Sequence, residues 1–123
     1  MTKTPTQSPP LPRRGEVWLA DLHGDKVRPV VVMTRTAVIR HLHSVIVAPV
    51  TSTIRSIPTE VPLGSSEGLL HESVANFDNV QLVPRQWLIR RVGVLSDAKL
   101  ASACDALIQA TGCNRLAASF SSN

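Results

Sequence analysis

Apolar residues along this chain occur in short runs, and the runs are separated by glycine, proline and small polar residues. Short runs rich in valine, isoleucine and tryptophan are typical of strands, and the residues between them are typical of turns. The pattern therefore predicts strands over residues 16–22, 28–34, 44–51, 59–63, 73–83 and 87–95.

Two of these runs carry further detail. The run over 28–34 is almost continuously apolar, which indicates burial on both faces of the strand. Pro29 is expected at the beginning of that strand, because proline has no N–H to donate to a neighbour. The run over 73–83 is interrupted around Asp78. Residues 35–43 are interpreted as a basic loop or a short helix.

The period of the apolar pattern changes near the C-terminus, where it becomes helical. Ser96 can cap such a helix, Asp97 suits its positive first turn, and Gly112 suits its end. The predicted fold class is mainly β with a C-terminal helix, a small β-barrel on which the helix packs. The residues at helical spacing are Leu100, Cys104, Leu107, Ile108 and Thr111.

The 123 residues fit one domain. We expect the domain to span 14–113, with a flexible proline-rich tail at 1–13 and a second flexible tail at 114–123. A chain of this length buries only a modest core, so a second subunit would add stability. The N-terminal segment lacks the apolar stretch of a secretory signal, and no run approaches the ~20 residues of a membrane span. We therefore expect a cytoplasmic protein that makes no membrane contact.

The net charge of +4 and the pI of about 9.8 favour a polyanionic partner such as nucleic acid. Cys104 and Cys113 are expected to be reduced thiols, and the four histidines lack the spacing of zinc ligands. We therefore expect neither a metal site nor a cofactor.

Arg28 and Thr51 are the first candidates for chemistry. Arg28 lies at the predicted mouth of the barrel, where a guanidinium offers paired donors to phosphate oxygens, although an isolated arginine there is more often solvated. The Thr51 hydroxyl, at the end of a strand, can hold a phosphate or a sugar hydroxyl; a turn threonine bonding its own backbone is commoner. Arg55, in the loop that Ser52 opens, supplies a second cation.

Asp78 lies inside an otherwise apolar stretch, where a carboxylate can act as a base or can orient another group. A hairpin or bulge aspartate is about equally consistent with its position. Phe77 and Trp87 could stack on bases, and Trp18 is interpreted as a core residue. For all three aromatic residues a place in the core is the favoured interpretation.

Six segments, taken in order and spacing, resemble the MazF/PemK family of toxin endoribonucleases over about Arg13 to Gly112. The resemblance implies an SH3-like barrel of the CcdB/PemK type with a C-terminal helix, assembled as a homodimer. It implies metal-independent, sequence-specific cleavage of single-stranded RNA, and a cognate antitoxin that blocks the RNA groove. The segments are RGEVW (14–18), RPVVV (28–32), VIVAPVTS (45–52), IPTEV (57–61), SVANFDN (73–79) and RVGVLS (91–96).

The resemblance also assigns roles to individual residues. Arg28 corresponds to the family's Arg-Pro arginine and Thr51 to the threonine that ends the third strand, and both are implied to be catalytic. Asp78 matches an acidic position that some members use, and His23 lies in the loop where some members have a catalytic histidine. Asn76 replaces the catalytic arginine of other members. The implied RNA-binding residues are Lys26, Ser52, Arg55 and Asn79, the last of which stands where many members have glutamine.

A metal-free ribonuclease can use the 2′-hydroxyl of its substrate as the nucleophile. Arg28 would stabilise the charge that develops on the phosphate, and Thr51 would position the phosphate or the 2′-hydroxyl. The base remains open between Asp78 and His23. Two alternatives also remain: a CcdB-like inhibitor of a protein such as gyrase, and an RNA-binding barrel without catalysis. CcdB-type proteins end in Trp-Gly-Ile, whereas residues 120–123 here are FSSN, which favours the ribonuclease.

Overall fold

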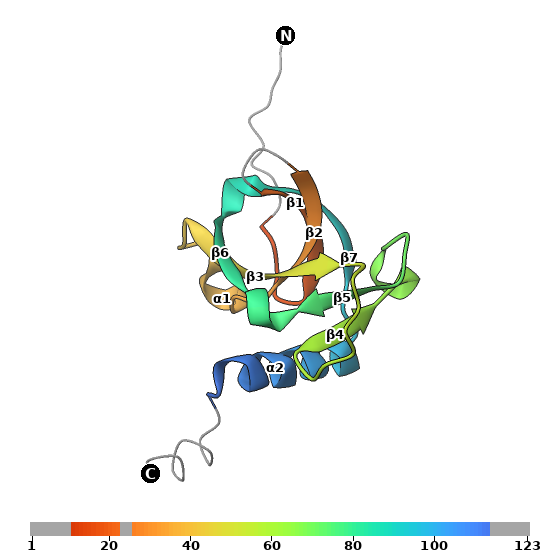
Figure 1. The fold of residues 1–123 in the computed structure, drawn as a ribbon. Coiled ribbons are helices and arrows are strands. Elements are labelled where there is room, and N and C mark those ends of the chain that lie inside the picture. Colours follow the sequence, from red (N-terminus) through yellow and green to blue (C-terminus); the bar gives the residue numbers. More distant parts are fainter. Residues whose placement is uncertain (1–10, 23–25, 114–123) are drawn as a thin grey trace.

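The computed structural model describes residues 11–22 and 26–113 (Figure 1). The elements follow the order expected from the sequence, with three short 3₁₀ turns between the later strands. They are β1 (Glu16–Leu22), β2 (Lys26–Val32), α1 (Thr36–Ile39), β3 (Ser44–Thr51), β4 (Glu60–Leu63), η1 (Ser65–Glu67), β5 (Ser73–Asn76), η2 (Phe77–Asn79), β6 (Gln81–Pro84), η3 (Arg85–Trp87), β7 (Leu88–Val94) and α2 (Asp97–Thr111).

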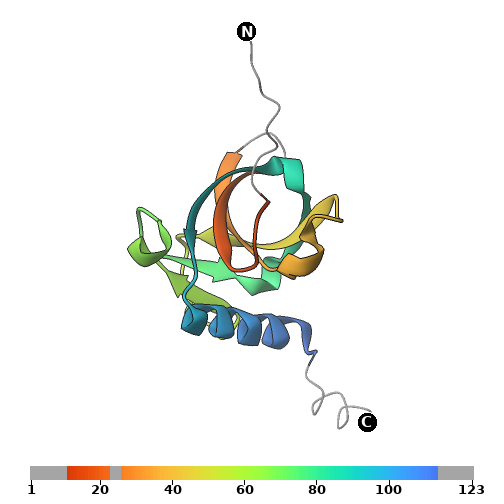
Figure 2. The same ribbon diagram turned by 180° about the vertical axis from the view of Figure 1, so that it is seen from behind.

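The strands form one antiparallel sheet in the order β4-β5-β3-β2-β1-β7, with β6 also paired to β3. One edge of β3 pairs with β2, and the other pairs first with β6 and then with β5. The sheet curls into a half-barrel, and α2 lies beneath β4 and β5 (Figures 1 and 2). This architecture confirms the prediction of a mainly β fold with a C-terminal helix.

Two apolar clusters share the strands of this sheet. The first fills the half-barrel around Trp18 and includes Val45 and Val47 of β3. The second lies between the sheet and α2 and includes Ala48 and Val50 of the same strand, because successive side chains alternate between the two faces. Trp18 and the fully buried Phe77 are core residues, as the sequence favoured.

Helix α2 begins and ends where its capping residues predicted. The Ser96 hydroxyl accepts a hydrogen bond from the Lys99 N–H at 3.1 Å, and Gly112 has a left-handed φ of 70°. The prediction of its buried side was partly wrong, since Ile108 is 38% exposed and Thr111 is exposed. The fully covered positions are Ala103 and Ala106, whose small side chains let the helix approach the sheet closely.

Strand β2 begins two residues earlier than predicted and ends at Val32. Pro29 therefore lies inside the strand, but it stands where β2 pairs with β1 alone, because the pairing with β3 begins at Val30. A missing N–H is tolerated at such a place. After the strand ends, the Thr34 hydroxyl accepts a hydrogen bond from the Ile46 N–H at 2.7 Å.

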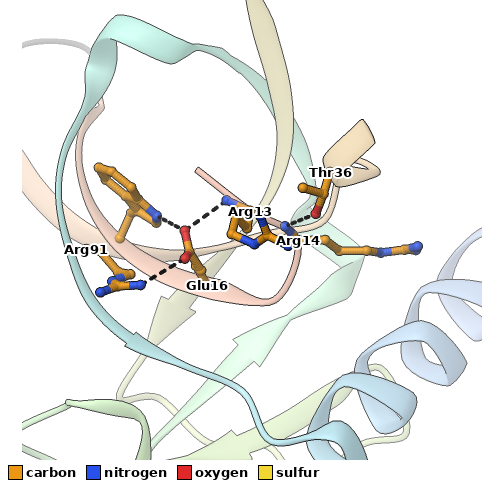
Figure 3. A network of polar contacts seen from close by, with 6 residues as sticks. Arg13, Arg14, Glu16, Thr36 and Arg91 are labelled. Carbon is orange, nitrogen blue, oxygen red and sulfur yellow. Dashed lines mark hydrogen bonds and ion pairs between the residues drawn. The ribbon is translucent and has the colours of Figure 1, made fainter. Parts of the chain in front are cut away.

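A buried carboxylate holds the beginning of β1 against β7 (Figure 3). Glu16 is 4% exposed, and its Oε1 accepts hydrogen bonds from the Arg13 N–H at 2.8 Å and the Trp18 indole N–H at 2.9 Å. Its Oε2 forms an ion pair with the Arg91 guanidinium at 3.1 Å. The sequence did not single out Glu16, which lies within an apparently regular strand.

The connection from β4 to β5 packs its backbone directly against β7. A Cβ placed on Gly68, which has a left-handed φ of 85°, would lie 2.0 Å from the Val92 carbonyl oxygen. A Cβ on Gly93 would lie 2.0 Å from the Glu67 carbonyl oxygen. Glu67 is itself buried and accepts a hydrogen bond from the Gly64 N–H at 2.7 Å. Only glycine is compatible with both sides of this contact.

Candidate active site

Arg28 and Thr51 lie on adjacent strands, each two residues beyond the last pair of β2 with β3, which joins Val30 to Pro49. At these positions Arg28 pairs with Ala20 of β1, and Thr51 pairs with Val74 of β5. Arg28 lies on the same face of β2 as Val30, and Thr51 lies on the same face of β3 as Val47. Val30 and Val47 both face the inside of the half-barrel. Arg28 is exposed and Thr51 is half-buried, so both are open at the mouth of the half-barrel.

The guanidinium of Arg28 has no hydrogen bond or ion pair to any residue that the structure describes. Its strand partner on β1 is Ala20, whose small side chain is fully buried. Arg28 is therefore held by its backbone on β2 while its five donors stay available to an anion. An arginine in this situation is suited to bind a phosphate group.

The Thr51 hydroxyl accepts one hydrogen bond inside the protein and keeps its own O–H free as a donor. Its Oγ1 accepts a hydrogen bond from the Thr53 N–H at 3.1 Å, the turn interaction that is common for threonine. Because the oxygen is the acceptor in this bond, the O–H can still donate to a ligand. The turn and the ligand-binding interpretations of Thr51 are therefore compatible.

The loop after Thr51 is held by Glu60, at the beginning of β4. Oε1 of Glu60 accepts hydrogen bonds from the backbone N–H groups of Arg55 and Ser56, both at 2.9 Å. Glu60 is 8% exposed, and its Oε2 is buried without a partner among the described residues. Ser56 has a φ of 57°, which the double hydrogen bond helps to maintain. The side chains of Ser52 and Arg55 are exposed on this loop.

Asp78 and Asn79 lie away from the Arg28–Thr51 pair. Thr51 pairs with Val74, near the beginning of β5, whereas η2 follows the other end of that strand and packs on α2. Oδ2 of Asp78 accepts a hydrogen bond from the Thr59 hydroxyl at 2.6 Å. Arg28 and Thr51 thus lie on adjacent strands β2 and β3, whereas Asp78 and Asn79 lie on η2, which follows the end of β5 opposite Val74.

The remaining candidates are Lys26 and His23. Lys26 is exposed at the beginning of β2 and is in step with Arg28 on the same side of the strand. His23 lies outside the described residues. Within 11–22 and 26–113, no three His, Cys, Asp or Glu side chains gather as metal ligands, and no helix is long and apolar enough to cross a membrane.

Sequence reasoning missed Glu60, which determines how the loop next to the site is held. Its position between Thr59 and Val61 indicates only a side chain on the opposite face of β4 from Val61. A single carboxylate at the start of a strand, with no oppositely charged residue directly after it in sequence, does not form a recognisable sequence motif. Its two donors, the N–H groups of Arg55 and Ser56, are close in sequence, but the turn that aims them at Glu60 is seen only in the structure.

A β half-barrel carrying a C-terminal helix is also the fold of solved MazF toxin structures. Residues 13–111 match the PemK-like, MazF-like toxins of type II toxin-antitoxin systems. The chain belongs to this family.

Similar proteins of known sequence and structure agree with this assignment. The chain is 41% identical over 106 residues to the probable endoribonuclease MazF5 of Mycobacterium tuberculosis, covering 85% of this chain and 97% of the relative. It is 46% identical over 88 residues to endoribonuclease MazF3 of the same species, covering 72% and 82%. The solved structure of the M. tuberculosis toxin MazF-mt6 superposes with a TM-score of 0.76 at 37% identity, covering 80% and 98%. A mycobacterial endoribonuclease in complex with its cognate antitoxin gives 0.75 at 32% identity, covering 84% and 97%.

Proposed function

We propose that this toxin is an endoribonuclease that cuts single-stranded RNA at specific sequences without a metal ion. Its membership of the family and its identity to relatives named endoribonucleases support the reaction class. The observation that carries the proposal is an exposed Arg28 on β2, with no side-chain partner among the described residues, and a Thr51 hydroxyl free to donate on the adjacent strand β3. The predicted alternative, a CcdB-like inhibitor of a protein target, is not favoured by these relatives.

In the proposed reaction the 2′-oxygen of the substrate attacks the adjacent phosphorus atom as its proton leaves. The bond from phosphorus to the 5′-oxygen breaks, and that oxygen takes up a proton. The products are a 2′,3′-cyclic phosphate and a free 5′-hydroxyl. Arg28 would stabilise the negative charge that grows on the phosphate oxygens, and preorganised charge of this kind is often the largest catalytic contribution. Thr51 would donate its free O–H to the same phosphate.

A further group has to accept the 2′-hydroxyl proton as a base. An arginine stays protonated and is unsuited to that role. The hydrogen bond from Thr59 to Asp78 supports a structural role for Asp78, because it ties the end of the 52–59 loop to η2. His23 is therefore the better of the two candidates.

We further propose that Lys26, Ser52 and Arg55 bind the RNA strand on either side of the reacting phosphate. All three are exposed near the Arg28–Thr51 pair, and phosphate contacts of lysine and arginine dominate the affinity for nucleic acid. Asn79 lies with Asp78 on η2, so any contact it makes belongs to a more distant nucleotide. The reaction needs cellular RNA, which supports a cytoplasmic location for the active toxin.

A cognate antitoxin and a homodimer complete the proposal. The mycobacterial endoribonuclease solved with its cognate antitoxin supports an antitoxin partner for this chain. A second copy is supported by Ile46 and Leu82, which pair across β3 and β6 and are 41% and 67% exposed. Exposed apolar pairs of this kind are typical of protein contacts. Changing Leu82 to Asp should convert the dimer to a monomer in size-exclusion chromatography with light scattering.

Incubation of the purified protein with a mixed RNA pool in EDTA tests the reaction. We expect discrete cuts that leave 2′,3′-cyclic phosphates, and no cut where a deoxyribose replaces the ribose on the 5′ side of the cut bond. Cleavage of a fully deoxy strand at the same rate would contradict the 2′-hydroxyl mechanism. Intact RNA from a correctly folded dimer would contradict the endoribonuclease itself.

A further inference from the structure

A hollow of about 540 Å³ lies next to Thr51 across the neighbouring strands of the sheet. Val74, which lines it, is the strand partner of Thr51, and Pro62 is in turn the strand partner of Val74. Ile54, in the loop after Thr51, also lines the hollow. Neighbouring strands are spaced by about 4.8 Å, so Pro62 is about 10 Å from Thr51 across the sheet. A nucleotide adjacent to a phosphate at Thr51 can reach this hollow.

The polar groups of the hollow suit a nucleobase better than a phosphate. No arginine lines it, and its cation, Lys99, donates a hydrogen bond to the Pro62 carbonyl oxygen. Its carboxylates are Glu67 and Glu72. Glu67 is buried and already accepts a hydrogen bond from the Gly64 N–H. Glu72 is exposed and has no hydrogen bond or ion pair to any residue in the described ranges.

We propose that this hollow holds a nucleobase next to the cut bond and that Glu72 selects bases carrying an exocyclic amino group. Ile54, Pro62 and Val74 provide apolar contacts for the faces of the ring. A carboxylate accepts hydrogen bonds from the exocyclic amino groups of adenine, cytosine and guanine, whereas the N3–H of uracil lies between two carbonyl oxygens that repel a carboxylate. The volume of the hollow falls within the range of ordinary ligand pockets. The inference rests on the proposed function, because it requires RNA cleavage at Thr51.

The test uses RNA oligonucleotides that carry A, C, G or U at one position beside the mapped cut and are otherwise identical. The wild-type protein should cut the three amino-bearing bases about tenfold faster, in kcat/KM, than U at one of the two flanking positions. In Glu72→Gln this ratio should fall close to one, because an amide can both donate and accept. Asp105→Asn, a matched change on the exposed part of α2 away from the hollow, should keep the wild-type ratio.

A second variant tests the apolar contacts of the hollow separately from the base selection by Glu72. Ile54→Ala should raise the KM of all four substrates while leaving their ratio unchanged. Wild-type base ratios in Glu72→Gln, with cleavage retained, overturn the inference and leave the proposed function standing. If the wild-type protein cuts none of the RNAs, the proposed function fails and this inference fails with it.

Discussion

The backbone N–H of Arg55 donates a 2.9 Å hydrogen bond to the buried carboxylate of Glu60. The neighbouring N–H of Ser56 donates to the same oxygen atom, so the loop between β3 and β4 closes around one side chain. This loop lies between the proposed catalytic Thr51 and the strand that begins at Glu60. The Glu60 carboxylate therefore fixes the backbone position from which the Arg55 side chain extends. Glu60 is not itself one of the two proposed catalytic residues, Arg28 and Thr51.

Replacing Glu60 by Ala should lower the free energy of unfolding by about 1–2 kcal/mol, because two loop N–H groups lose a charged acceptor. RNA cleavage should weaken mainly through a higher KM, since Arg55 loses its fixed position. Glu60→Gln keeps an acceptor oxygen and should show smaller effects on both quantities. Urea denaturation and steady-state kinetics measure them, and equal losses in the two variants would contradict the role of the acceptor.

Arg28→Ala should reduce kcat by about 10²–10³-fold, the usual effect of removing one preorganised electrostatic group. Arg28→Lys should recover only part of the loss, because an ammonium lacks the paired planar donors of a guanidinium. The thermal midpoint should not change, since Arg28 is exposed. Arg40→Ala is the matched control, because Arg40 lies near α1, between the far ends of β2 and β3. Full activity of a folded Arg28→Ala protein would rule out this role.

Two variants of Thr51 separate the contribution of its hydroxyl to activity from the contribution of its side-chain shape. Thr51→Val keeps the shape and removes both the acceptor for Thr53 and the donor to phosphate, so kcat/KM should fall by about tenfold or more. Thr51→Ser keeps the hydroxyl and should retain most of the activity. Cleavage assays with a single fluorescent RNA measure the difference. Equal activity of the Val and Ser variants would show that the hydroxyl has no part in the reaction.

Glu16→Ala should destabilise the protein far more than Arg91→Ala. The first change leaves the Trp18 indole and the Arg13 N–H without their acceptor, at a cost of about 2–4 kcal/mol. The Arg91 side chain is 61% exposed, so its ion pair with Glu16 should contribute less than about 1 kcal/mol. Urea denaturation of the two variants gives the comparison, and similar losses in both would contradict it.

Local sequence signals accounted for most of the fold. The caps at Ser96 and Gly112 and the bounds of β1 and β3 were all predicted, because each depends on neighbours in sequence. The buried side of α2 was predicted only in part. Ala103 and Ala106 are covered because the helix packs on η2 and β4, and that distance is set by tertiary contacts.

The candidate site shows the same division between local and long-range information. Arg28 and Thr51 were identified by their segments, and they lie on adjacent strands, each two residues beyond the Val30–Pro49 pair. Asp78 was also identified by its segment, but η2 follows the far end of β5 and carries it away from the pair. Glu60 could not be found in advance, because its hydrogen bonds depend on how a loop returns to its own strand.

The contact of Gly68 with β7 fixes the middle of the connection from β4 to β5 and leaves a short loop on either side of it. The loop around Ser65 and the loop that leads to Glu72 both border the proposed base pocket, and the second also contains Leu70, which is 94% exposed. Added residues in a surface loop raise its closure entropy only slowly with length. A tag or fluorescent label inserted next to Leu70 should therefore leave the protein folded, but it should also change the base preference, because Glu72 of the proposed pocket follows two residues later.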